Sequence, residues 1–556
     1  MTKSKGFFMK NFKRIISLLL SLIISATLLI SCDWVLFIPV NTTSKGLPEY
    51  TLTENYVEET KNLLKQAENT TLNNKTTIEI NFAWSQFIDR YYEIATQANV
   101  SFILFASDSE NEEYKQAYLF ANNSYSELYG LYTDSLKRIY NSPSSETFFY
   151  GWTKEEINAI LNHDEEVVAL EQENSELEVE YASLDDDEFT DGAVEIYKQI
   201  IKNNNKIASK FGFENYYEYA SKTVYERDYS KTELAFFRDS VANMIVPLAD
   251  KVISGLSEQK ELLTSNELSI VSQLVYNDYD KTKVNYWQNY LNSYQDSSLK
   301  SKLSHAFDNQ NVTFANGANS REMAFTANLP SKNKSYCYFG PGYQDVFTVA
   351  HEIGHYSAGL TLGIESVSMD LKETHSQANE MLLLDYLSTE ISPNAYEVLK
   401  SSIIGETLAS IVICSIIDEF EYRVFTQKSV DEFTSEDFDG LMSEVCEKYG
   451  GVDYVNEKFT DINLYWRKVV VEQPIYYISY ATSGFSAINL YVSACANRQE
   501  ARESYDRLIS LSDTSLGFVG SLKSAGLVNP FTAEAFKTFQ DYVLGSGELT
   551  PVEPLA

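Results

Sequence analysis

Residues 347–356 read FTVAHEIGHY, and the spacing of the two histidines limits what this part of the chain can fold into. His351 and His355 are four positions apart, so on an α-helix their side chains project from one face, one turn apart. Two imidazoles placed in this way can grip one metal ion, and HExxH on a helix is typical of zinc peptidases. Glu352 lies between them, close enough to act as general base on a water at the metal. The run therefore predicts a zinc-binding helix.

The apolar residues around the motif support the helix. Val346, Ala350 and Ile353 follow one another at i, i+4 and i+7, which places them in one stripe for burial. The alternative is that His351 and His355 are ordinary residues of a helix that matched the pattern by chance. A third metal ligand is needed to separate the two interpretations.

Residues 373–380, ETHSQANE, open a second helical stretch and offer that ligand. Glu373, Ser376 and Glu380 fall on one helix face, together with Gln377, so one carboxylate can bind the metal while the other supports a ligand histidine. A catalytic zinc takes three protein ligands and keeps one position open, so the pattern predicts one Zn²⁺ per chain. His375 points away from this face, and we expect it either behind the ligands or facing substrate.

HEIGH followed by ETHSQANE resembles the thimet oligopeptidase, neurolysin and oligoendopeptidase F family of zinc metallopeptidases, whose pattern is HExGH and then a helix carrying ExxSxxxE. Residues 474–487, PIYYISYATSGFSA, look like the tyrosine-rich stretch of the oligoendopeptidase F branch. The resemblance implies these roles: zinc ligands His351, His355 and Glu373; general base Glu352; supporting residues Glu380 and Ser376; and, facing the scissile carbonyl, Tyr480 with Tyr476 or Tyr477.

The resemblance also implies a neurolysin-like fold, mainly α, in which two helical halves flank a deep channel that admits short unfolded peptides. Composition agrees with a helical chain, because 556 residues include only 11 Pro and 23 Gly. Around residues 320–342, short β-prone pieces separated by Pro, Lys-Asn and Gly-Pro-Gly predict one or two strands just before the motif helix. Such an edge strand could pair with an extended peptide.

One departure from the family keeps a second function open. The family usually has a histidine just ahead of the tyrosine-rich segment, whereas residues 463–473 read NLYWRKVVVEQ and the last histidine of the chain is His375. We expect a zinc endopeptidase that hydrolyses short peptides. The alternative is a catalytically weak or inactive zinc-binding lipoprotein that captures peptides. A structural or adhesive surface protein would leave residues 351–380 as coincidence.

The net charge of the chain limits the classes of partner that it can bind. Asp and Glu number 79 against 44 Lys and Arg, a formal net charge of -35, which repels nucleic acid. We expect no nucleic-acid partner and a monomer.

The N-terminus predicts export. Basic residues precede an apolar run from Ile15 to Ser31, the layout of a secretory signal, and the run ends in LISC, which resembles a bacterial lipobox with Cys32 as the lipidated residue. An uncleaved transmembrane anchor is the alternative, although the run is short for a span of roughly 20 residues. Both place the body outside the cytoplasm, anchored to a membrane. The predicted division is a lipoprotein signal peptide (1–31), a tether (32–50), an N-terminal helical domain (51–300), a zinc-peptidase catalytic domain (301–545) and a disordered tail (546–556).

Overall fold

The computed structural model describes residues 46–544 except 74, 164, 183, 185–188, 276–280, 295–296, 364–366 and 428–429. The predicted signal peptide, the lipidation site Cys32, most of the tether and the C-terminal tail lie outside the described residues. In the part of the chain that is described, no helix combines the length and apolar character needed to cross a membrane.

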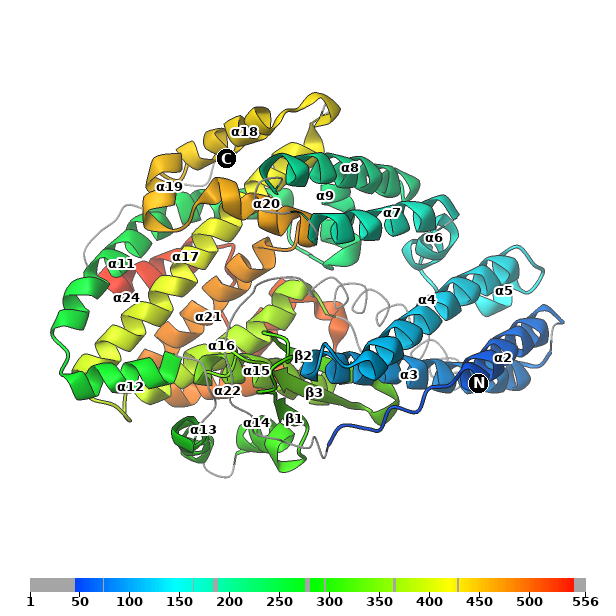
Figure 1. The fold of residues 1–556 in the computed structure, drawn as a ribbon, viewed down its shortest axis with the longest axis horizontal. Helices are drawn as coiled ribbons and strands as arrows, with labels where there is room; N and C mark the ends of the chain where they lie inside the picture. Colours follow the sequence, from blue (N-terminus) through cyan, green and yellow to red (C-terminus); the bar gives the residue numbers. More distant parts are fainter. Residues whose placement is uncertain are drawn as a thin grey trace.

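Helices dominate the architecture, as predicted (Figure 1). The first group is α2 (Glu54–Leu72), α3 (Thr77–Ser107), α4 (Glu112–Tyr140), α5 (Ser145–Phe148), α6 (Lys154–Asn162) and α7 (Glu165–Ala182). It is followed by α8 (Phe189–Lys210), α9 (Tyr216–Tyr219), α10 (Lys231–Ser240), α11 (Val246–Glu261), α12 (Ser265–Val275), α13 (Lys281–Ser293) and α14 (Ser298–Asp308). Two π-helical turns, η1 (Ala220–Val224) and η2 (Val241–Ile245), interrupt this region.

The C-terminal helices include those that carry the predicted site. They are α15 (Val346–Leu362), α16 (Met369–Leu387), α17 (Pro393–Thr426), α18 (Ser435–Glu447), α19 (Val452–Lys458), α20 (Ile462–Glu472), α21 (Ile478–Ala496), α22 (Arg498–Ile509), α23 (Gly517–Ala525) and α24 (Ala533–Leu544). Three 3-10 turns accompany them, η3 (Pro330–Lys332), η4 (Val430–Glu432) and η5 (Thr514–Leu516).

A small sheet lies directly before α15 in the chain. Its strands are β1 (Val312–Phe314), β2 (Ala324–Leu329) and β3 (Lys334–Phe339), in the order β1-β3-β2. Strand β3 is parallel to β1 and antiparallel to β2, with Thr326 opposite Cys337. Strand β2 is therefore an edge strand beside the motif helix. The predicted fold class, mainly α with a short edge sheet at the site, is confirmed.

The buried side chains form two large cores. One includes Trp84, Phe87 and Tyr132 and holds α2, α3 and α4 together. The larger one runs from Tyr181 to Phe539 and surrounds α16, α17 and α21. Residues before position 300 thus share a core with α15 and α16, which carry the predicted metal ligands. The domain division proposed from the sequence stays a prediction.

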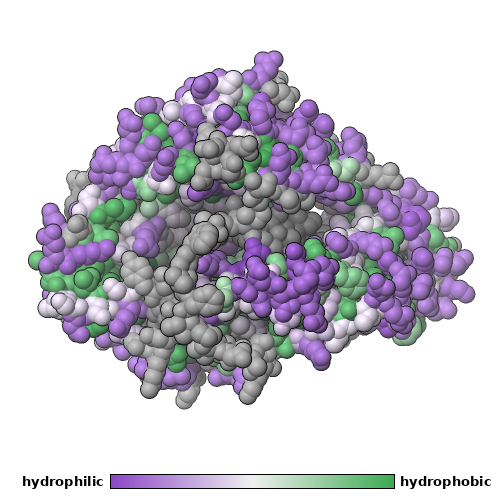
Figure 2. All heavy atoms as spheres, viewed as in Figure 1, coloured by the Kyte–Doolittle hydropathy of each residue, from purple (hydrophilic) through white to green (hydrophobic). Residues whose placement is uncertain are grey.

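Other elements lie around α15 and α16 on several sides. In Figure 1, α7, α8, α18 and α20 lie above these helices, α2, α3 and α4 lie to their right, and the sheet lies beside α15. Figure 2 shows that the described residues on this face are mostly hydrophilic.

Helices α15 and α16 approach unusually closely at Gly354. The side-chain amide of Asn379 donates to the carbonyl of Ala350, 2.7 Å away, across the same contact. A Cβ added at Gly354 would lie 2.5 Å from the carbonyl oxygen of His375 and 2.6 Å from the Cα of Ser376. Both are backbone atoms and cannot move alone, so only glycine permits this spacing.

We expect Gly354→Ala to push α15 away from α16. Overpacking of this kind typically costs about 1 to 3 kcal/mol of stability, and the metal ligands on the two helices would also separate. Denaturant unfolding and zinc titration should both report a loss relative to the parent chain.

Gly440 provides the control, because it lies within α18 and an added Cβ there meets nothing within 4 Å. Gly440→Ala should leave zinc affinity unchanged and raise stability by up to ~1 kcal/mol. Zinc affinity that is equal in both variants would contradict the close-packing argument.

Candidate metal centre

Helix α15 begins just ahead of the motif and fixes its orientation. The Asp345 carboxylate accepts hydrogen bonds from the backbone N–H groups of Phe347 and Thr348, at 2.9 and 3.0 Å, and so caps the helix. The predicted stripe Val346, Ala350 and Ile353 is fully buried, all at 0% exposure. Burial of that stripe turns both motif histidines toward α16.

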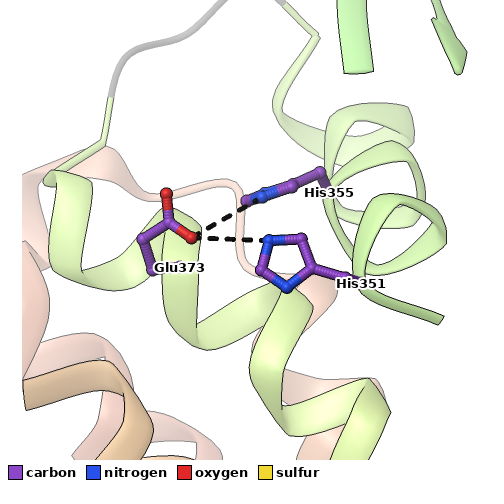
Figure 3. A group of neighbouring side chains, drawn as sticks. All are labelled: His351, His355 and Glu373. Carbon is purple, nitrogen blue, oxygen red and sulfur yellow. Dashed lines mark ion pairs between the residues drawn. The ribbon is translucent and has the colours of Figure 1, made fainter. Parts of the chain in front are cut away.

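The two histidines and Glu373 meet between α15 and α16 (Figure 3). Glu373 Oε2 lies 3.6 Å from His351 Nε2 and 3.8 Å from His355 Nε2. Two ligands of a tetrahedral ion with bonds of about 2.1 Å stand about 3.4 Å apart, so the separations are close to those of a zinc site. The three residues form a metal-binding triad.

The surroundings of the two carboxylate oxygens of Glu373 support a bound cation. Its Oε1 accepts a hydrogen bond from the Tyr476 hydroxyl at 2.8 Å, but among the described residues its buried Oε2 has no hydrogen-bond partner. A buried carboxylate oxygen without a partner is costly, and a metal ion between Glu373 and the histidines would satisfy it. The residues present therefore fit zinc.

Glu380 lies outside the triad and contacts His351 instead. Glu373 is therefore the carboxylate at the metal position, and Glu380 is the one that supports a ligand histidine. Its Oε1 lies 2.6 Å from His351 Nδ1, on the far side of the imidazole from the triad. Burial alone would lower the pKa of His351, but the hydrogen bond and charge of Glu380 outweigh it and raise that pKa to about 9. Glu380 thus orients His351 with its Nε2 toward the metal position.

Glu352 is buried beside the triad and is held by the sheet. Its Oε2 accepts a hydrogen bond of 2.7 Å from the Thr326 hydroxyl on β2. Burial raises the pKa of Glu352, while the charge of His351 and the Thr326 hydrogen bond oppose that rise. The pKa of the Glu352 carboxyl is therefore higher than that of an exposed glutamate. This suits a group that must both take up and release a proton.

The tyrosine-rich segment reaches the triad from the end of α20 and the start of α21. The Tyr476 hydroxyl contacts Glu373 and lies 3.1 Å from the Tyr480 hydroxyl. Burial, followed by the charge of Glu373, raises the pKa of both tyrosines well above its usual range, so both hydroxyls keep their protons. Tyr477 packs its ring edge-to-face on that of Tyr476, with centroids 5.7 Å apart.

Ser376 and His375 also belong to α16. The Ser376 hydroxyl donates to the backbone carbonyl of Glu373 at 2.8 Å, so it contacts the backbone of the ligand residue. His375 is buried, and the Tyr505 hydroxyl donates to its carbonyl at 2.8 Å. Burial, with a smaller effect from the charge of Lys372, lowers the pKa of His375 to about 3, so its ring is neutral.

Sequence reasoning missed Thr326 and Lys372. Thr326 faces α15 because alternate residues of a strand share a face, but the partner of that face could not be known before the fold. Lys372 directly precedes Glu373. Burial is the main cause that lowers the pKa of His355 and of His375, and the charge of Lys372 lowers both further. An unexplained lysine next to a predicted ligand was the available signal.

Comparison with known proteins agrees with this geometry. A model of peptidase family M3 matches residues 187–509. An oligoendopeptidase F homolog of Borreliella burgdorferi is 25% identical over 181 residues, which make up 31% of this chain and 30% of that protein. The match thus spans less than a third of the curated relative.

Solved structures extend the likeness in fold to most of the chain. PZ peptidase A with inhibitor 2 has a TM-score of 0.69 at 17% identity, covering 89% of this chain and 98% of that chain. Oligoendopeptidase-F from Enterococcus faecium has a TM-score of 0.54 at 14% identity, covering 89% and 98%. Because the family match spans more than half of the 556 residues, the chain belongs to peptidase family M3, the metallopeptidases that its motifs resemble.

Proposed function

We propose that the protein is a zinc-dependent endopeptidase that hydrolyses short unfolded peptides, with one Zn²⁺ held by His351, His355 and Glu373. The observation that carries the proposal is the triad with a buried carboxylate, Glu352, immediately beside it. When bound, zinc polarises the peptide carbonyl and lowers the pKa of a water molecule. The chain supplies the proton transfers and the contacts to the developing charge.

Each nearby side chain has a distinct task in this proposal. Glu352 takes the proton from the attacking water and delivers it to the leaving amine, because its raised pKa lets it act in both directions. Tyr480, with Tyr476 behind it, donates toward the carbonyl oxygen as negative charge develops there. Glu380 holds the imidazole of His351, and Ser376 stabilises the turn that carries Glu373.

The alternative is a zinc-binding protein that captures peptides without efficient turnover. The absence of a histidine from residues 463–473 favours it. The buried Glu352 argues against it, because a carboxylate beside the metal carries a burial cost that a pure binder has no chemical reason to retain.

The first test compares the parent chain with Glu352→Gln in cleavage of a quenched-fluorescence peptide library. General acid–base catalysis typically contributes about 100- to 10,000-fold to the rate. Glu352→Gln should therefore lower the cleavage rate by at least about 100-fold. Zinc content should remain one per chain, and a chelator should abolish cleavage by the parent chain.

Glu110→Gln, at an exposed turn, is the control and should cleave like the parent. Tight peptide binding and one zinc per chain without turnover in the parent chain would instead support the capture protein.

The hydrogen bond from Thr326 predicts a pH effect. That bond favours the ionised form of Glu352, so Thr326→Val should raise the pKa of the carboxyl further. Cleavage needs the ionised base, and its acid limb in a plot of kcat/KM against pH should therefore move to higher pH. Thr326→Ser retains the hydroxyl and should keep the parent profile; an equal shift in both variants would contradict this role for the hydrogen bond.

We also propose that the mature protein is a lipoprotein anchored outside the cytoplasm through Cys32. The apolar run ending in LISC supports this location. A bacterium that expresses the full chain and is fed an alkyne fatty acid should label the parent protein but not Cys32→Ser. Cys495→Ser, which removes an exposed cysteine, should still be labelled. Unlabelled parent protein that remains in the membrane fraction would favour an uncleaved anchor.

A further inference from the structure

The backbone directly before Tyr476 has an unusual conformation. Ile475 has a φ of 66°, in the left-handed region that β-branched residues rarely occupy, and its side chain is fully buried. Glu226, in the loop after η1 between Tyr225 and Arg227, also has a positive φ, of 51°. Non-glycine residues in this region persist only where the surrounding structure holds them, and they cluster at functional sites.

Buried side chains from two distant elements hold this backbone. The Ile475 N–H donates to Glu421 Oε1 on α17 at 2.8 Å. Arg227 Nη2 donates to the Ile475 carbonyl at 2.7 Å and also lies 3.2 Å from the Tyr476 carbonyl oxygen. The Tyr225 hydroxyl donates to the Pro474 carbonyl at 2.7 Å. Both backbone polar groups of Ile475 are thus bound by side chains.

The same arginine connects this segment to the helix that carries the third ligand. Arg227 Nε lies 3.4 Å from Asp370 Oδ2, at the start of α16 and about one turn before Glu373. Arg227 Nη2 also donates to the Ser479 hydroxyl at 2.9 Å, one position before Tyr480. Arg227 therefore contacts α16, which carries Glu373, and α21, which carries Tyr480.

We infer that Arg227 and Glu421 form a backbone clamp that holds Ile475 in the left-handed conformation and so positions the hydroxyls of Tyr476 and Tyr480 at the metal centre. This inference rests on the proposed function for its catalytic consequence, although the positioning itself does not require turnover. Tyr476 precedes α21, so helix geometry does not fix its hydroxyl. Without the clamp the backbone relaxes toward ordinary φ values and the hydroxyl moves away from Glu373, and displacements of about 1 Å can cost about 100-fold in rate.

The first variant is Arg227→Met, with Arg238→Met as its matched control. Arg238 is also buried and forms an ion pair with Asp418 at 2.9 Å, and its ring contact is with Tyr422 rather than with the tyrosine segment. Arg227→Met should lower kcat by about 10-fold or more, with a smaller effect on KM, while retaining zinc. Arg238→Met should reduce thermal stability without that loss of kcat.

A second pair of variants remains informative if Arg227→Met does not fold. Burial raises the pKa of Glu421 well above its usual range, so this side chain is a neutral acid that Gln closely matches. Glu421→Gln keeps the acceptor for the Ile475 N–H and should behave like the parent chain. Glu421→Leu removes the acceptor and should lower kcat as Arg227→Met does.

A mutant cycle with Tyr476→Phe and Tyr480→Phe together separates positioning from general destabilisation. If Arg227 acts through the two tyrosines, the kcat loss from Arg227→Met should be much smaller in the background that lacks both hydroxyls. Multiplicative losses in the cycle would overturn the inference.

A spectroscopic readout makes the inference independent of turnover. With 3-fluorotyrosine placed at position 476 alone, the ¹⁹F signal should shift in Arg227→Met and Glu421→Leu but not in Arg238→Met or Glu421→Gln. If the parent chain has no peptidase activity but the signal still shifts in Arg227→Met and Glu421→Leu, the proposed function is refuted and the clamp is supported. An unchanged signal in the folded Arg227→Met and Glu421→Leu proteins would overturn the clamp, whatever the activity.

Discussion

The close approach of α15 to α16 at Gly354 is the constraint on which the metal centre depends. Helices usually pack with their axes 8 to 10 Å apart, at a distance set by the side chains between them. Here a glycine contacts the backbone at His375 and Ser376, and the Asn379 side chain bridges to the Ala350 carbonyl. A spacing set by backbone atoms leaves little freedom, so it fixes how far Glu373 and Glu380 stand from the histidines.

The electrostatics of this contact are unfavourable without a cation. Burial raises the pKa of Glu352, Glu373 and Glu380, because each carboxylate loses solvent and the charges repel one another. One protonated imidazole, that of His351, is the principal compensating charge within the cluster. A divalent ion supplies more positive charge at the point where three ligand atoms already converge, so metal binding and stability of this region should be coupled.

The short-range parts of the site could be predicted from the sequence, and the long-range parts could not. Helical spacing alone places His351 and His355 on one face, and Ala350 with Ile353 in the core. The choice between Glu373 and Glu380 as ligand depended on the resemblance, because both lie on the same helix face. Thr326 was missed because the partner of a strand face depends on tertiary packing, and no local pattern encodes it. Even so, the β-prone pieces around residues 320–342 correctly predicted that strands precede the motif helix.

Helix α16 contacts both α15 and α21, and these two contacts explain how the tyrosines come to the metal. Glu373 and Glu380 face the histidines of α15, while Asp370 accepts hydrogen bonds from Tyr229 and Ser479 and so connects α16 to α21. Secondary structure fixes the first relation, because the ligands repeat at helical spacing. The second relation involves an irregular segment, and irregular backbone has no repeating hydrogen bonds to define its path. Its geometry must come from individual side chains, which is why buried polar side chains from residues 225–227 and from α17 surround it despite the cost of their burial.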